Sequence, residues 1–299
     1  MLDHTFFVSA VLVFDGQELK RLQKPAFITL GHPALAARRE GRISPMKHIA
    51  ISPAGEFSLG GVNFVVDMSA KNRRASDSNA FTIVKGKAYL RFYEELAASF
   101  SPRSILELGV FQGGSYVLLD KLFNPQRMSG VDISAEPVAP LLNYLTGLQN
   151  RFVHFSTPQR NRDALTRIVR DELAGELDLV VDDASHTYEE TRASFEVLFP
   201  LLNADGIYVI EDWSWAHTPG FQALDAPFAS RPALSNLIFE QIMLLGSTSS
   251  IAEIRILKNL YFIRKSAGSS TVVADGAAQS DEASVFDQIL SRDKKWTLI

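Results

Sequence analysis

The stretch SILELGVFQGGS, residues 104–115, decides the fold of this chain. It begins as an apolar run that predicts a buried strand, turns at Gly109, and leads into the apolar residues 114–123, which predict a helix. Glycine lets a backbone turn sharply and come close to a ligand. The turn lacks the dinucleotide fingerprint G-x-G-x-x-G, because the next glycines after Gly109 are Gly113 and Gly114. The stretch therefore predicts the first strand–turn–helix unit of an α/β fold and argues against a dinucleotide ligand.

The same alternation of strand and helix continues toward the C-terminus. Further strands are predicted at 128–133, 151–155, 177–182, 206–210, 251–257 and 260–264. Helices are predicted at 140–148, 163–173, 188–202 and 234–245. Apolar strands that alternate with helices form a parallel sheet covered on both faces, but the last two strands have a two-residue link and must be antiparallel. We therefore predict a Rossmann-like, doubly wound, mostly parallel seven-stranded sheet with an antiparallel C-terminal hairpin strand.

Composition divides the chain into three regions. Residues 1–85 mix short apolar runs with glycine and proline, and predict a small β-rich accessory region for oligomerisation or acceptor binding. Its predicted strands lie at 6–14, 46–52 and 62–68. Residues 86–265 hold the alternating strands and helices, and residues 266–299 are rich in Ser, Gly, Ala and Asp. This last region predicts a flexible C-terminal tail.

The overall composition excludes several classes of protein. The chain has 299 residues, no cysteine, a formal net charge of −4 and a pI of about 5.9. Without cysteine there are no disulfides, thiolate zinc sites, iron–sulfur clusters or cysteine nucleophiles, and the acidic balance argues against nucleic-acid binding. The apolar run at 6–14 is too short to span a bilayer and follows no Lys or Arg. We expect a cytoplasmic protein with no nucleic-acid or membrane partner.

The carboxyl ends of the first two strands predict a cofactor site, because ligands of open α/β sheets bind there. The first strand ends at Glu107 before the glycine turn, and the second ends at Asp132. Asp132 can accept ribose hydroxyls, whereas Glu107 suits a cationic amino group, such as that of S-adenosylmethionine, better than a pyrophosphate. The predicted cofactor residues are Glu107, Gly109, Gly113, Ser115, Asp132 and Ile133. The alternative is that they are only turn glycines and strand-end acids.

Two later strands end in acidic pairs, Asp182-Asp183 and Glu211-Asp212. In the predicted topology these strands are neighbours, about 4.8 Å apart. Carboxylates crowded in this way either take up protons or bind a cation. Oxygen ligands favour Mg²⁺, with Mn²⁺ or Ca²⁺ as other candidates, over zinc. The two strand ends therefore predict a metal site.

His186 follows Asp183 by three residues, where the chain turns into the next predicted helix. Beside a metal, a histidine can take a proton from a substrate hydroxyl, whose pKa the metal lowers. A capping or hydrogen-bonding histidine is the alternative. Four aromatic residues near the strand ends are candidates for the wall of an acceptor pocket: Phe111, Tyr116, Trp213 and Trp215.

These motifs together resemble the macrocin and mycinamicin type of sugar O-methyltransferase and the related cephalosporin-hydroxylase-like family. The resemblance covers roughly residues 86–215 and rests on two patterns, Glu107-x-Gly109-x-x-x-Gly113-Gly114-Ser115 and Asp182-Asp183-x-Ser185-His186 with Glu211-Asp212 after it. It implies a class I S-adenosylmethionine-dependent methyltransferase. The implied metal ligands are Asp183, Glu211 and Asp212. The implied catalytic residues are Asp183 and His186, with His186 as general base, and Asp182 joins the implied cofactor residues. Where relatives often carry a Gly-Asp-Gln-like segment, this chain has STPQ at 156–159.

The sequence therefore predicts a metal-dependent O-methyltransferase that transfers a methyl group to a hydroxyl of a sugar or glycosylated natural product. Its cofactors would be S-adenosylmethionine and Mg²⁺, its partner a small hydroxylated acceptor, and its state a homo-oligomer. Two alternatives stay open. One is a nicotinamide-dependent oxidoreductase on a similar sheet, against which the missing fingerprint argues. The other is a non-catalytic binding or assembly protein that keeps the cofactor fold.

Overall fold

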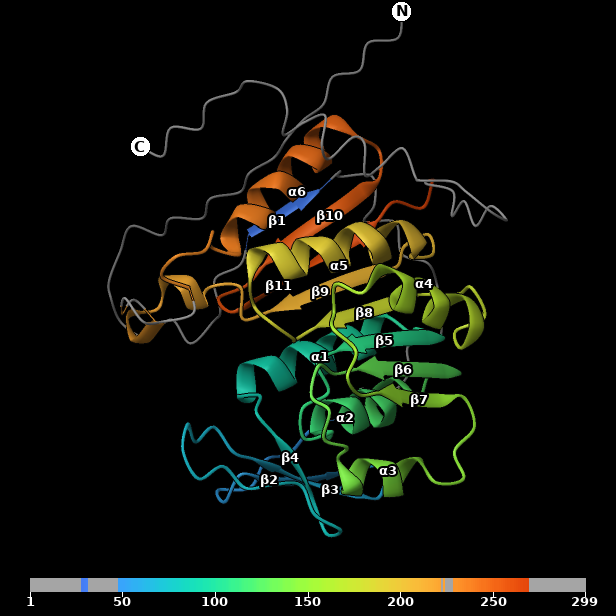
Figure 1. Ribbon diagram of the computed structural model, residues 1–299, viewed down its shortest axis with the longest axis vertical. Coiled ribbons are helices and arrows are strands. Elements are labelled where there is room, and N and C mark those ends of the chain that lie inside the picture. The colour runs from blue at the N-terminus through green and yellow to red at the C-terminus, as the bar shows by residue number, and fades with distance from the viewer. Residues whose placement is uncertain (1–27, 32–47, 222, 224–227, 269–299) are drawn as a thin grey trace, which may run out of the picture. The chain divides into compact units, whose positions relative to one another are not determined.

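The computed structural model describes residues 28–31, 48–221, 223 and 228–268 (Figure 1). The chain divides into two compact units. One comprises residues 38–185, and the other comprises residues 1–37 together with 186–299.

The unit of residues 38–185 contributes four parallel sheet strands in the order β8-β5-β6-β7 (Figure 1). These are β5 (Ser104–Leu108), β6 (Arg127–Val131), β7 (Arg151–His154) and β8 (Leu179–Asp182). Every residue of β5 and β8 is buried. Continuous burial explains why these strands are mostly apolar, since a parallel strand covered on both faces leaves no exposed side. Glu107 and Asp182 are buried acids near the carboxyl ends of β5 and β8.

Four helices accompany these strands: α1 (Lys87–Ser99), α2 (Gly114–Phe123), α3 (Ala139–Leu145) and α4 (Arg162–Asp171). α2 begins directly after the glycine turn and packs against α1. α4 begins after Asn161, whose side chain accepts a hydrogen bond from the backbone N–H of Ala164 at 3.1 Å. Such a cap satisfies an otherwise unpaired amide of the first helical turn.

A second, three-stranded sheet precedes α1 in the same unit. It consists of β2 (Glu56–Leu59), β3 (Val62–Val66) and β4 (Phe81–Ile83), with β3 antiparallel to β2 and parallel to β4. β3 lies within the predicted strand 62–68. The prediction at 46–52 is wrong over its described part, because residues 48–52 form no strand. There the backbone N–H of Ile49 donates to the Glu94 carboxylate of α1, not to a neighbouring strand. The predicted strand at 6–14 lies outside the described residues.

The other unit contributes four antiparallel sheet strands in the order β1-β10-β11-β9 (Figure 1). These are β1 (Ile28–Gly31), β9 (Ile207–Glu211), β10 (Ile251–Ile256) and β11 (Leu260–Lys265). The β10–β11 hairpin is antiparallel, as its short link predicts. No sequence pattern predicts β1, which extends this sheet from a distant part of the chain.

Two helices and two short 3₁₀ segments complete this unit. They are α5 (Tyr188–Leu201), α6 (Ser235–Ser247), Trp215–His217 and Pro219–Phe221. α6 packs on β10 and on α5. The α/β class, with parallel strands followed by an antiparallel C-terminal hairpin, is therefore confirmed. Among the residues that the structure describes, no helix combines the length and the apolar character that crossing a bilayer requires. The proposed division at residues 85 and 265 stays a prediction.

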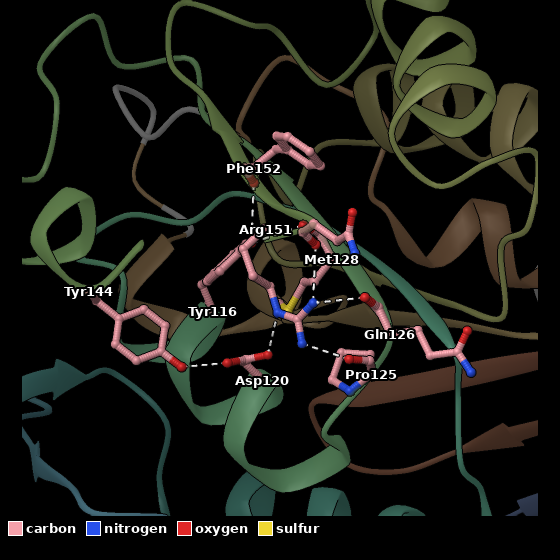
Figure 2. A network of polar contacts seen from close by, with 9 residues as sticks. Tyr116, Asp120, Pro125, Gln126, Met128, Tyr144, Arg151 and Phe152 are labelled. Atoms are coloured by element: carbon pink, nitrogen blue, oxygen red, sulfur yellow. Dashed lines mark hydrogen bonds and ion pairs between the residues drawn. The ribbon is translucent and has the colours of Figure 1, made fainter. Parts of the chain in front are cut away.

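A buried polar network ties α2 and α3 to the edge strand β7 (Figure 2). Asp120 of α2 accepts hydrogen bonds from Arg151 Nε at 2.6 Å and from the Tyr144 hydroxyl of α3. The Arg151 guanidinium also donates to the carbonyls of Pro125 and Gln126, at 2.6 and 3.1 Å. The side chains of Arg151 and Asp120 are only 11% and 8% exposed. A pair so well shielded from water is costly to break from one side.

We expect Asp120→Ala to lower the free energy of unfolding by about 3–5 kcal/mol, because it leaves the Arg151 charge buried without its carboxylate. Denaturant unfolding followed by circular dichroism would measure this loss. Asp171→Ala is the matched control, because Asp171 pairs with Arg170 at the exposed end of α4. An equal effect of the two substitutions would contradict a structural role of the network.

Candidate functional site

The glycine turn after β5 lies directly against the chain leaving β8. Gly109 has a φ of +87°, and a Cβ atom placed on it would lie 2.3 Å from the carbonyl oxygen of Asp183. On the same side, the backbone N–H of Asp183 donates to the Leu108 carbonyl at 2.9 Å. Gly113, with a φ of +80°, immediately precedes α2. A glycine is therefore required at position 109 for two reasons: its positive φ, and the close approach of the segments that follow β5 and β8.

Asp132 fixes the glycine turn from the end of β6. Its Oδ2 accepts the backbone N–H groups of Val110 and Phe111 at 3.1 and 2.8 Å, and its Oδ1 accepts that of Ser134 at 2.8 Å. An ionised carboxylate has about four acceptor sites, so these bonds leave little capacity for a further partner. A contact with one ribose hydroxyl fits this geometry better than a contact with both. Ile133, the next predicted cofactor residue, is 75% exposed.

Asp182, at the end of β8, is bound by a residue that no sequence pattern predicts. Gln159 Nε2 donates to both Asp182 carboxylate oxygens, at 3.1 and 3.2 Å, and Gln159 Oε1 accepts the backbone N–H of Ser185 at 2.8 Å. Both Asp182 and Gln159 are buried. Gln159 belongs to the STPQ segment in which this chain departs from the family pattern. That glutamine holds the end of β8 and the loop after it in one arrangement.

Glu107 is fully buried in β5, two residues before Gly109. A charge in such a place interacts strongly with any cation that reaches it, because the low dielectric of the interior screens it weakly. This environment suits the predicted contact with a cationic amino group. The role itself stays a prediction, as do those of Gly113 and Ser115 in cofactor binding.

Asp183 forms an ion pair with a buried lysine. Lys85 Nζ lies 2.5 Å from Asp183 Oδ2, and the side chains are 3% and 23% exposed, respectively. Lys85 lies between β4 and α1, which end and begin two residues to either side of it. The two residues are 98 positions apart in the chain. Because neither spacing nor periodicity links such distant residues, the sequence alone offers no signal for this contact.

The second acidic pair lies at the end of β9, in the other unit. Glu211 is the last residue of this strand and is 1% exposed, whereas Asp212 is half-buried. The backbone N–H of Asp212 donates to the Asn259 carbonyl at 2.6 Å. This bond fixes the main chain of Asp212 at the β10–β11 turn.

His186 lies against an aromatic cluster that consists of Trp215, Phe221 and Phe228. The rings of His186 and Trp215 have centroids 4.3 Å apart. Trp215 stacks on Phe221 at 5.1 Å and meets the edge of Phe228 at 6.3 Å. The cluster therefore supplies an apolar surface directly beside the predicted general base.

The other aromatic candidates differ in their surroundings. Tyr116 is fully buried, and its hydroxyl donates to the Met128 and Phe152 carbonyls, so it is a core residue that no acceptor can reach. Burial also raises the pKa of Tyr116 above its ordinary value. Trp213 donates from Nε1 to the Leu257 carbonyl at 3.0 Å. Phe111 is 52% exposed and available to a ligand.

Three residues of the predicted site have left-handed backbones although they are not glycine: Phe111, His186 and Asp212, with φ of +44°, +55° and +57°. Such conformations cost energy and concentrate at functional sites. All three lie in loops that directly follow strand ends. Each of the loops that carry the predicted chemistry thus holds a left-handed residue, although several other turns of the described chain do so too.

Comparison with known proteins agrees with the motifs. Residues 106–213 match the family model of a methyltransferase domain. The 8-demethyl-8-alpha-L-rhamnosyl tetracenomycin-C 2'-O-methyltransferase of Streptomyces olivaceus is 30% identical over 143 residues, which are 45% of this chain and 35% of that protein. Mycinamicin VI 2''-O-methyltransferase of Micromonospora griseorubida is 33% identical over 124 residues, 39% of this chain and 29% of that protein. This chain therefore aligns with about a third of the length of these relatives.

A solved methyltransferase of the mycinamycin biosynthetic pathway, in complex with Mg, SAH and mycinamycin VI, aligns with a TM-score of 0.44 and 25% identity. The alignment covers 64% of this chain and 51% of that one. The family model confirms a methyltransferase domain, and the relatives confirm the predicted resemblance to sugar O-methyltransferases. The family match begins in β5 and ends just after Asp212, so it includes both the glycine turn and the second acidic pair.

Proposed function

We propose that this chain is an S-adenosylmethionine-dependent O-methyltransferase that requires a divalent metal and methylates a hydroxyl group of a sugar on a natural product. The observation that carries the proposal is the extent of the methyltransferase match, which includes every predicted cofactor, metal and catalytic residue between 107 and 212. The relatives named above are sugar O-methyltransferases, which supports the acceptor class.

The residues around the glycine turn fit S-adenosylmethionine in chemical type. The buried Glu107 carboxylate would take the amino group, the turn held by Asp132 would accommodate the methionine and ribose parts, and the exposed Ile133 side chain would cover the adenine. When bound, S-adenosylmethionine supplies a methyl group on a sulfonium and leaves as S-adenosylhomocysteine. Asp182, bound by Gln159, would close the site on the β8 side.

The acids fit a hard divalent cation. Asp183 and Asp212 are half-buried and can each offer a carboxylate oxygen, which is the type of ligand that Mg²⁺ prefers. Glu211 would be the third ligand, as the family resemblance implies. The cation would supply a Lewis acid that lowers the pKa of the acceptor hydroxyl.

His186 would take the proton from that hydroxyl. Its ring packs against Trp215, so its orientation is restricted by a rigid neighbour, as a general base requires. The aromatic cluster would bind the apolar C–H face of a sugar and leave its hydroxyls to the polar residues. Binding the acceptor beside the base would hold its oxygen in line with the methyl group.

The proposal predicts that chelation abolishes methyl transfer. We expect EDTA to reduce S-adenosylhomocysteine formation from S-adenosylmethionine and a deoxysugar glycoside to background, and added Mg²⁺ to restore it. Liquid chromatography of the products would measure both. Full turnover by the chelated protein would remove the metal from the mechanism. Tight NADH binding without any S-adenosylmethionine binding in calorimetry would favour an oxidoreductase.

A further inference from the structure

The buried ion pair between Lys85 and Asp183 places an ammonium group against a proposed metal ligand. The Lys85 side chain is 3% exposed and its Nζ is 2.5 Å from Asp183 Oδ2. An ammonium group loses several kcal/mol of hydration when it is buried, so it needs a partner that offsets this cost. In this unit Asp183 supplies that partner.

Asp183 is held through its backbone as well as its side chain. Its backbone N–H extends the pairing of β8 with β5 by donating to the Leu108 carbonyl, and its carbonyl oxygen lies at the close approach to Gly109. The carboxylate is therefore fixed relative to the glycine turn, with one of its oxygens on Lys85. A ligand fixed in this way is preorganised, because no side-chain rotation has to be frozen when a cation arrives.

A lysine in this position also opposes a second cation. Like charges a few ångströms apart repel in a site shielded from water, so the ammonium weakens the attraction of Asp183 for a metal ion. A neutral side chain in place of Lys85 would remove this repulsion.

We propose that Lys85 is the counter-charge of the metal site. It positions the Asp183 carboxylate and keeps the affinity for the divalent cation low, so that the ion exchanges with solvent instead of remaining permanently bound. This inference rests on the proposed function, since it concerns the same metal. A purely structural lysine would stabilise the fold but would not lower the affinity for the cation.

The test is Mn²⁺ binding to the full-length chain by electron paramagnetic resonance, because free Mn²⁺ is counted directly and no turnover is needed. We expect Lys85→Met and Lys85→Gln to bind Mn²⁺ about tenfold more tightly than the wild type, since both remove the charge. Lys85→Arg keeps the charge and should bind within about threefold of the wild type. Asp183→Asn should bind more weakly, and in the double variant Lys85→Gln/Asp183→Asn the gain should disappear.

The melting midpoint in EDTA and in saturating Mn²⁺ gives a second readout, because a ligand that binds more tightly stabilises the folded state more. The Mn²⁺-dependent rise should be larger for the neutral variants than for the wild type. If the neutral variants bind Mn²⁺ no more tightly than the wild type, Lys85 is not a counter-charge. Binding of Mn²⁺ by the wild type would in that case still support the proposed metal dependence. If the neutral variants bind Mn²⁺ and the wild type does not bind it measurably, the inference is supported. If no variant binds Mn²⁺, the inference and the proposed metal site both fail.

Discussion

Replacement of His186 by alanine is expected to lower kcat for methyl transfer by about two to four orders of magnitude, the usual contribution of a positioned general base. His186 is the imidazole closest in sequence to the acidic strand ends, and its ring packs on Trp215 at 4.3 Å. Without it, the acceptor proton would have to leave to solvent. Initial rates with saturating S-adenosylmethionine and acceptor would measure the loss.

His217→Ala is the matched control for this substitution. His217 lies two residues after Trp215 in the same unit, and its Nε2 is 2.7 Å from the Ser235 hydroxyl. Its removal should leave kcat within about threefold. S-adenosylmethionine binding by calorimetry should be unchanged in both variants. If His186→Ala retained the wild-type kcat, a capping role for this histidine would be the better interpretation.

Gly109→Ala is expected to destabilise the chain by about 2–5 kcal/mol. A left-handed conformation costs about 1–2 kcal/mol in any residue with a Cβ, and forcing an extra methyl into a packed site adds about 1–3 kcal/mol. At Gly109 that methyl would lie 2.3 Å from the Asp183 carbonyl oxygen and 2.9 Å from the Ala184 Cα. Neither backbone can move without disturbing the β5–β8 pairing. Urea unfolding of the purified variant would measure the loss.

Gly147→Ala separates the two costs. Gly147 has a φ of +81° and no heavy atom within 4 Å of a Cβ placed on it. It should therefore lose only about 1–2 kcal/mol, the conformational part. Equal losses at the two glycines would show that the turn tolerates the extra methyl, and that the close approach of the segments that follow β5 and β8 is not what requires Gly109.

Local sequence determined most of the fold. The apolar runs at β5, β8 and β9 are long enough and continuous enough to be buried strands, and each of the last two ends in an acidic pair. The two-residue link requires the C-terminal hairpin to be antiparallel. These features depend on residues that are neighbours in the chain, so periodicity and turn chemistry reveal them. The spacing of the glycine turn and the acids also identified the methyltransferase resemblance that the family match confirms.

The tertiary structure decided which side chains complete these strand ends. Gln159 reaches Asp182 across 23 positions and Lys85 reaches Asp183 across 98. No short-range pattern encodes such contacts, because they arise only when separate strands are packed side by side. Local sequence also failed to predict the burial of Tyr116. Its place beside the glycine turn predicted a pocket wall, whereas packing buries it completely. The local sequence thus determined which types of residue lie at the site. Long-range packing determined the partners of these residues, the charges near them and their accessibility.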